Sequence, residues 1–202
     1  MTRRTKRMIS WCIAVFVIAL TALSAAPEPQ REYASSGEGT PARAVLSELP
    51  VKGRAPKTGY DRAQFGDGWG DLNGCDVRNT ILYRDLREVV LSEECIVTSG
   101  TLDDPYTGTT ISFSRSNPSA VQIDHVVALS DAWQKGAQQL SSQSREQFAN
   151  DPLNLLAVDG QANQQKGDGD AATWLPPANS FRCSYVARQI AVKQKYALWV
   201  TQ

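Results

Sequence analysis

The chain has 202 residues, of which 42% are hydrophobic and 21% are charged, and it contains a single histidine. Its 21 basic and 21 acidic side chains give a formal net charge of zero. The length suits one domain behind a leader, and the charge excludes a generalised basic surface that would attract polyanions.

Residues 1–26 have the layout of a secretory signal: the basic stretch MTRRTKR, the apolar run ISWCIAVFVIALTAL, and then small residues. We expect cleavage near residues 24–26 and a secreted protein with no stable membrane association afterwards. The alternative is an uncleaved anchor formed by residues 8–26, which are just long enough to span a bilayer. Cleavage removes four basic side chains and no acidic ones, which leaves 17 basic and 21 acidic residues and a net charge of −4.

Three cysteines remain after that cleavage, Cys75, Cys95 and Cys183. In an oxidising compartment the simplest arrangement is one disulfide and one unpaired thiol. The short loop between Cys75 and Cys95 favours this pair, and a bridge to Cys183 stays open as the alternative. No Cys–Cys or Cys–His spacing indicates a zinc site.

Residues 27–56 are rich in Pro, Ser, Gly and charge, and they predict a flexible linker with one short helix at 42–49. Residues 57–202 form the expected domain. Its first helix is predicted over 76–86, and Val89 and Val90 continue the same helical spacing. The later elements begin with a hairpin of strands at 95–102 and 107–115 and a strand at 121–124 that ends on His125. Two helices at 126–137 and 141–150 follow, and then an extended segment at 152–159, a short helix at 160–168 and a long terminal helix at 180–200. This order predicts an α+β domain.

The polar residues that stand out begin with Asp124 and His125, at the end of the predicted strand VQID. Asn154 follows 29 positions after His125 in the apolar segment PLNLLAV, Asn163 comes nine positions later, and Lys166 three positions after that. A strand, a turn and a short helix would bring Asn163 back beside the strand that carries His125. We therefore expect these residues to form one site.

The set D-H, N and N-x-x-K resembles the ββα-metal motif of HNH-type nucleases in its H-N-N form, including the nuclease domain of CRISPR effector proteins. The blocks YDRAQFGDGW, CDVRN, DPYTG, IDHVVALSDAW, FANDPLNLLAV, NQQKGD and WLPP also resemble secreted actinobacterial HNH-family proteins over residues 60–202. The departure from the strict HNH pattern is an asparagine where the last histidine would stand. The resemblance implies a ββα-metal core embedded in additional helices and a short β-hairpin.

The same resemblance implies a secreted, metal-dependent endonuclease that cuts DNA, or RNA, with little sequence preference. His125 would be the general base and Asn154 would orient its ring or the surrounding loop. Asp124 and Asn163 would hold one divalent cation through oxygen atoms, with Mg²⁺ expected and Mn²⁺ or Ca²⁺ as alternatives. Lys166 would contact flanking phosphates, as would Arg62 or Arg78. We expect a monomer.

Other interpretations stay open at this point. Each candidate residue has a structural alternative: His125 as an exposed or structural histidine, Asn154 as the holder of a buried turn, Asn163 as a helix cap, and Lys166 as a solvated side chain. As a whole, the domain is then a non-catalytic secreted binding module that keeps the HNH-type fold. A serine hydrolase that pairs His125 with a serine is disfavoured, because no G-x-S-x-G elbow occurs.

Overall fold

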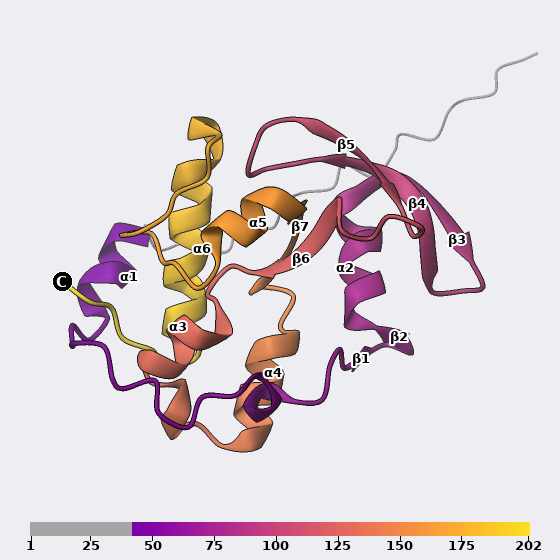
Figure 1. The fold of residues 1–202 in the computed structure, drawn as a ribbon. Coiled ribbons are helices and arrows are strands. Elements are labelled where there is room, and N and C mark those ends of the chain that lie inside the picture. Colours follow the sequence, from indigo (N-terminus) through magenta and orange to yellow (C-terminus); the bar gives the residue numbers. More distant parts are fainter. Residues whose placement is uncertain (1–41) are drawn as a thin grey trace, which may run out of the picture. The chain divides into compact units, whose positions relative to one another are not determined.

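The computed structural model describes residues 42–202, so the expected signal peptide and the first part of the expected linker lie outside the described residues. Helices and small antiparallel sheets alternate along this part of the chain (Figure 1), which confirms the α+β class. The helices are α1 (Ala42–Glu48), α2 (Val77–Asp85), α3 (Leu129–Gln134), α4 (Ser142–Asn150), α5 (Gly160–Lys166) and α6 (Arg182–Lys195), with 3-10 turns η1 (Arg62–Phe65), η2 (Ala137–Gln139) and η3 (Asn179–Phe181). The strands are β1 (Asp71–Leu72), β2 (Cys75–Asp76), β3 (Leu86–Ser92), β4 (Ile96–Asp103), β5 (Thr110–Ser114), β6 (Val121–His125) and β7 (Leu155–Asp159).

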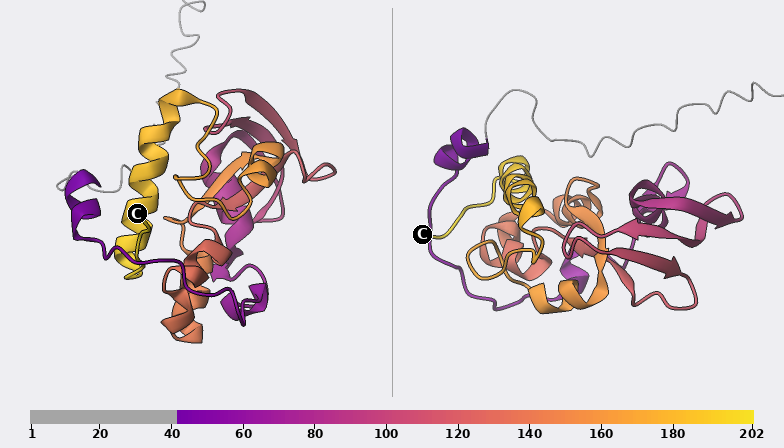
Figure 2. Two further views of the ribbon diagram at one scale, coloured as in Figure 1. Left: turned by 60° about the vertical axis from the view of Figure 1, so that its left-hand side comes forward. Right: turned by 90° about the horizontal axis from the view of Figure 1, so that it is seen from above.

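The described strands pair in three antiparallel sheets: β1 with β2, β3–β4–β5, and β6 with β7. The three-stranded sheet lies at one end of the domain and helices α1 and α6 lie at the other (Figure 2). The helix predicted over 76–86 corresponds to α2, which ends before Leu86, and Val89 and Val90, although they fit the same helical spacing, belong to β3. β-branched side chains favour an extended backbone, and here a hairpin partner, β4, satisfies the hydrogen bonds of that backbone.

The β6–β7 pair carries the candidate residues. Its register places His125 opposite Leu155 and Asp124 opposite Leu156. The chain leaves β7 directly into α5, whose N-cap is Asp159. Gly160 must follow, because a Cβ at this position would lie 1.9 Å from the carbonyl oxygen of Ser119. A residue without a side chain therefore allows α5 to lie against the start of β6.

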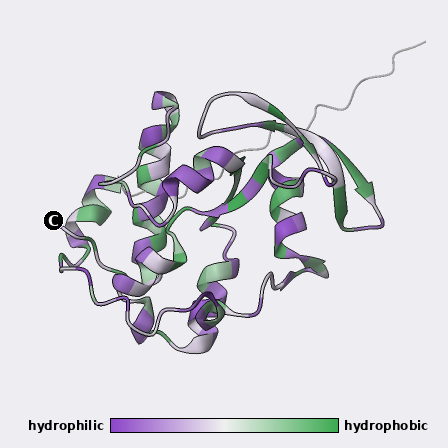
Figure 3. Ribbon diagram, in the orientation of Figure 1, coloured by the Kyte–Doolittle hydropathy of each residue, from purple (hydrophilic) through white to green (hydrophobic). Residues whose placement is uncertain are grey.

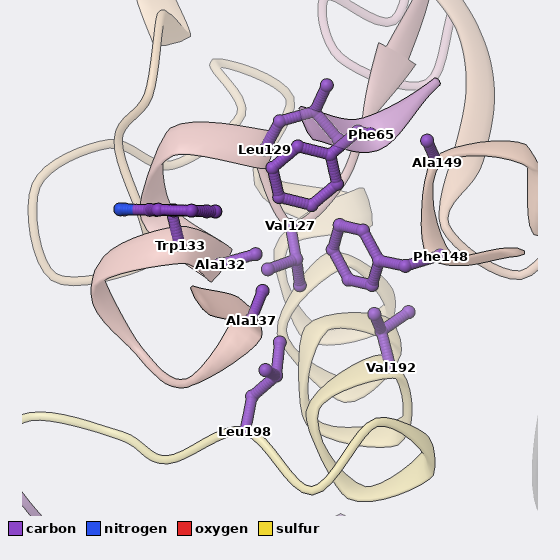
Figure 4. Packing of buried hydrophobic residues seen from close by; sticks show 10 residues of the cluster. All are labelled: Phe65, Val127, Leu129, Ala132, Trp133, Ala137, Phe148, Ala149, Val192 and Leu198. Carbon is purple, nitrogen blue, oxygen red and sulfur yellow. The ribbon is translucent and has the colours of Figure 1, made fainter. Parts of the chain in front are cut away.

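Hydrophobic side chains form several buried clusters among the described residues. The cluster between α3, α4, α6 and η1 is seen in Figure 4. Burying each large side chain contributes roughly 1.5–3 kcal/mol. The colouring of α6 in Figure 3 alternates between hydrophobic and hydrophilic, as expected for a helix that buries one stripe. The cluster drawn in Figure 4 contains Phe65, Val127, Leu129, Ala132, Trp133, Ala137, Phe148, Ala149, Val192 and Leu198.

The described part of the expected linker, residues 42–56, is docked on the domain. Val45 and Leu49 are buried with Ile190 of α6. A short parallel ladder joins this segment to the end of the chain, with a bridge between Val51 and Val200. These contacts show that the packed domain begins before residue 57.

The predicted disulfide is confirmed, with Cys75 joined to Cys95 and Cys183 unpaired and exposed. It ties strand β2, which directly precedes α2, to the turn between β3 and β4. The cross-link fixes the three-stranded sheet to the body of the domain.

Candidate functional site

The five candidate residues come together around β6, β7 and α5. Asp124, His125 and Asn163 line one cavity of about 470 Å³. Asn154 and Lys166 lie behind it and are buried. Antiparallel pairing of β6 with β7 and the immediate turn into α5 produce this convergence.

His125 has one ring nitrogen committed to the protein. Its Nε2 lies 2.9 Å from the carbonyl oxygen of Ala149, in the last turn of α4, where helix carbonyls lack partners within the helix. A carbonyl only accepts, so Nε2 carries the hydrogen and Nδ1 of the neutral ring is left as an acceptor. The geometry therefore selects the tautomer in which Nδ1 can take a proton.

The imidazole is also held flat against an indole. Trp69 stacks on it with ring centroids 5.8 Å apart and planes 7° apart. Burial lowers the pKa of His125 from 6.5 to about 4, although the bond to Ala149 and the charge of Asp124 oppose this. The ring is therefore neutral, and able to accept a proton, at neutral pH.

Asp124 is held through both carboxylate oxygens. Lys166 Nζ donates to Oδ1 at 2.9 Å, and the hydroxyl of Tyr106 donates to Oδ2 at 2.5 Å. Burial, and then the charge of Asp124, raise the pKa of Tyr106 well above its usual value, so the phenol keeps its proton. Each carboxylate oxygen still has a lone pair that neither bond uses.

Lys166 faces inward. Besides Asp124, its ammonium donates to the carbonyl oxygen of His125 at 2.9 Å, and its side chain is completely buried. The expected contact with flanking phosphates does not fit this arrangement. The N-x-x-K spacing instead places Lys166 one turn of α5 from Asn163, beneath the site rather than in the cavity.

Asn154 holds the loop that follows His125. Its Oδ1 accepts from the backbone N–H of Val127 at 2.8 Å, and its Nδ2 donates to the carbonyls of Val127 and Phe148 at 3.3 and 3.4 Å. Its own carbonyl accepts from the N–H of Val126 at 2.8 Å. Of the two expected roles, these contacts fit orientation of the loop and not of the ring.

Asn163 lies on α5 and is one of the residues that line the cavity. Its Nδ2 donates to Gln122 Oε1 at 2.9 Å, which leaves Oδ1 without a donor among the described residues. Within residues 42–202 no group of three or more His, Cys, Asp or Glu side chains could enclose a metal ion. A carboxylate and an amide oxygen are the types of donor that Mg²⁺ takes, and this ion is usually held by one or two carboxylates while it keeps several waters or substrate oxygens.

Sequence reasoning missed Tyr106 and Gln122 as parts of the site. Gln122 had a usable signal, because residues two apart on a strand share a face and Gln122 stands two positions before Asp124. Tyr106 belongs to the turn after β4 and reaches Asp124 only through tertiary packing.

Comparison with known proteins gives a family match and a relative of similar length. The C-terminal domain of GmrSD restriction endonucleases matches residues 76–202, well over half of the chain. A protein of Arthroderma benhamiae with the name "Uncharacterized secreted protein" is 38% identical over 188 residues, which cover 92% of this chain and 90% of that protein. These matches support a nuclease family. They do not support the narrower expectations that the family is actinobacterial and that the motif is the H-N-N form.

No solved structure matches the chain significantly. None of the helices in residues 42–202 has the length and apolar character needed to cross a membrane. The alternative anchor at residues 8–26 lies outside the described residues.

Proposed function

Because the chain belongs to the family of GmrSD restriction endonuclease C-terminal domains, a nuclease family, we propose that it is a metal-dependent endonuclease of the HNH type. Its substrate is DNA, or RNA, cut with low sequence specificity. The strand–strand–helix order of β6, β7 and α5 supports the ββα-metal assignment of the core.

One observation carries the mechanism: the bond from His125 Nε2 to the Ala149 carbonyl. It leaves Nδ1 as the acceptor on a ring that lines the same cavity as Asp124 and Asn163. His125 acts as the general base, taking a proton from water at Nδ1 while the water oxygen bonds to phosphorus. The P–O bond to the 3′ oxygen then breaks and this oxygen takes a proton from solvent water, which gives 5′-phosphate and 3′-hydroxyl products.

Asp124 and Asn163 hold one divalent cation, Mg²⁺ by the hardness of their oxygens, with Mn²⁺ or Ca²⁺ as alternatives. When bound, this ion supplies charge stabilisation for the phosphoryl oxygens and the departing oxygen. Tyr106 and Lys166 keep the carboxylate of Asp124 in one orientation. These two residues are positioning residues, because neither needs to touch the substrate.

Secretion is part of the proposal. The N-terminal pattern of basic, apolar and small residues supports it, and the name of the Arthroderma benhamiae relative contains the word secreted. The protein acts as a monomer, without stable attachment to a membrane after signal cleavage.

A plasmid-nicking assay tests the function. Wild-type protein with Mg²⁺ should convert supercoiled DNA into nicked and linear forms, and excess EDTA should abolish this. His125→Ala and Asn163→Ala should each lower the rate by at least about 100-fold. Asn179→Ala, an exposed asparagine of η3 away from the cavity, is the matched control and should cut at the wild-type rate. Cutting that survives both EDTA and His125→Ala would refute the mechanism.

The second candidate is a secreted binding module that keeps the fold without turnover. The net charge of −4 after signal removal gives it some support, since nothing in the bulk charge draws the protein to nucleic acid. Titration calorimetry with Mg²⁺ and a short duplex separates the two candidates. Metal binding by a protein that never nicks the plasmid would favour the binding module.

A further inference from the structure

Residues 60–69 precede the family domain and yet form one wall of the candidate site. Tyr60 and Arg62 line the cavity that also contains Asp124 and His125. Trp69 stacks on the imidazole. The family domain alone therefore does not complete the site, and this segment supplies side chains to it.

Arg62 lies where two hollows meet. A second, smaller cavity of about 170 Å³ is lined by Trp69 and Ala149, and it shares Arg62, His125 and Leu129 with the larger one. Any chain-like ligand that occupies both cavities must pass Arg62 and His125. This is the place where a phosphodiester backbone would meet the general base.

The backbone that carries Arg62 is fixed by its neighbours. Arg62 is the first residue of η1, and Asp61 caps this turn by accepting from the N–H of Ala63 at 2.8 Å. Phe65, at the other end of the turn, is 1% exposed and packs in the cluster of Figure 4. The backbone at Arg62 is therefore held in place, whereas its side chain, which ends in the guanidinium, is exposed.

The guanidinium of Arg62 has no hydrogen bond or ion pair with any residue of the described range 42–202. Arg78, the other arginine of the larger cavity, lies over the ring of Phe113 at 6.0 Å. A planar cation with five unused donors matches two oxygens of a phosphate.

We propose that Arg62 binds the phosphate at which cleavage occurs, donating two hydrogen bonds to its non-bridging oxygens. This inference rests on the proposed function, which supplies the phosphodiester. Negative charge on those oxygens grows as the reaction proceeds. The contact therefore contributes more to kcat than to binding of the ground state.

Three variants test this assignment. Arg62→Gln should lower kcat/KM for plasmid nicking by about 100-fold. Arg62→Lys should recover part of the loss, because it keeps the charge but not the planar fork. Arg43→Gln, which changes an exposed arginine of α1 that lines neither cavity, is the matched control and should behave as wild type. Melting curves should coincide for all four proteins.

A binding measurement without turnover separates this inference from the proposed function. Anisotropy of a fluorescein-labelled duplex is followed in EDTA over a series of NaCl concentrations. Arg62→Gln should reduce the slope of log K against log salt by about 0.9, the value for one lost phosphate contact, relative to Arg43→Gln.

The outcomes are distinct. If wild-type protein cuts DNA and Arg62→Gln matches Arg43→Gln in both rate and salt slope, the assignment of Arg62 is overturned and the nuclease proposal stands. If wild-type protein binds without cutting and the slope still falls, Arg62 contacts phosphate and the nuclease proposal fails. A wild-type protein that neither binds nor cuts overturns both.

Discussion

Replacing Lys166 with methionine removes a buried ammonium from beneath the candidate site while keeping most of the side-chain volume. Two hydrogen bonds disappear, those to Asp124 Oδ1 and to the carbonyl of His125, both 2.9 Å long. The Lys166 and Asp124 side chains are 0% and 5% exposed, so the carboxylate loses its buried counter-charge. It keeps only the bond from Tyr106.

Breaking a buried ion pair costs about 3–5 kcal/mol, and the remaining Tyr106 bond places Lys166→Met near the lower end, at about 3 kcal/mol. For a domain of this size that is a fall in Tm of roughly 6–12 °C. The assay is urea and thermal unfolding in EDTA. Asp124→Asn removes the charge that needs Lys166, so the double variant should recover roughly 1–3 kcal/mol as coupling energy.

Lys52→Met is the control, because the Lys52 side chain is exposed and its ammonium lies over the ring of Trp199, 5.1 Å from the centroid. It should change stability by less than about 1 kcal/mol. The reasoning is refuted if Lys166→Met is equally mild, shows no coupling to Asp124→Asn, and instead weakens DNA binding in a salt-dependent way. That pattern would mean that Lys166 contacts phosphate from the surface.

Three further changes have definite expected results. Gly160→Ala forces a Cβ to within 1.9 Å of a backbone carbonyl oxygen, so it should displace α5, destabilise the domain by roughly 3 kcal/mol or more and abolish nicking. The control is Gly53→Ala, which has open space around it and should be neutral in the same melting and nicking assays. The pKa of His125 is 6.5 in the unfolded chain and about 4 in the folded protein, so its contribution to the free energy of unfolding is complete above pH 6.5 and is lost progressively as the pH falls toward 4. In EDTA, the free energy of unfolding of wild type should therefore fall by about 3 kcal/mol more than that of His125→Gln over this range. Removing the Cys75–Cys95 disulfide with a double alanine variant should cost about 3 kcal/mol in urea unfolding, since the two cysteines are 20 positions apart, and an unchanged midpoint would contradict this estimate.

Much of the fold followed from local patterns. Helix α2 ends close to its predicted boundary, and α4 begins after Ser141, whose side chain accepts from the N–H of Ser144. Strand β6 ends at His125 as expected. Caps and periodicity act within a few residues, and this is why they can be read from the chain. Strand β3 was not predicted, because its two adjacent valines fit both the helical and the strand period, and only the partner strand decides between them.

The sequence indicated part of the candidate site, but neither Tyr106 nor Gln122 nor the contacts that hold the site together. Asp124, His125 and Asn163 share a cavity, as the spacing predicts. The inward direction of Lys166 and the bond from Tyr106 depend on how α5 and the turn after β4 pack on β6, over separations of 42 and 18 residues. No local rule fixes such contacts, because burial of a charged group is decided by the whole surrounding structure.

The backbone pairing between residues 50–53 and the end of the chain determines from which edge of the domain a tag or tether would extend. Lys52 N–H donates to the carbonyl of Val200 and Val200 N–H donates to that of Pro50, both at 3.0 Å. Trp199 adds a bond from its indole to the carbonyl of Gly53. A purification handle or a surface tether placed at either end of the packed domain would therefore emerge from the same edge, and immobilised protein would present one common orientation to the solution.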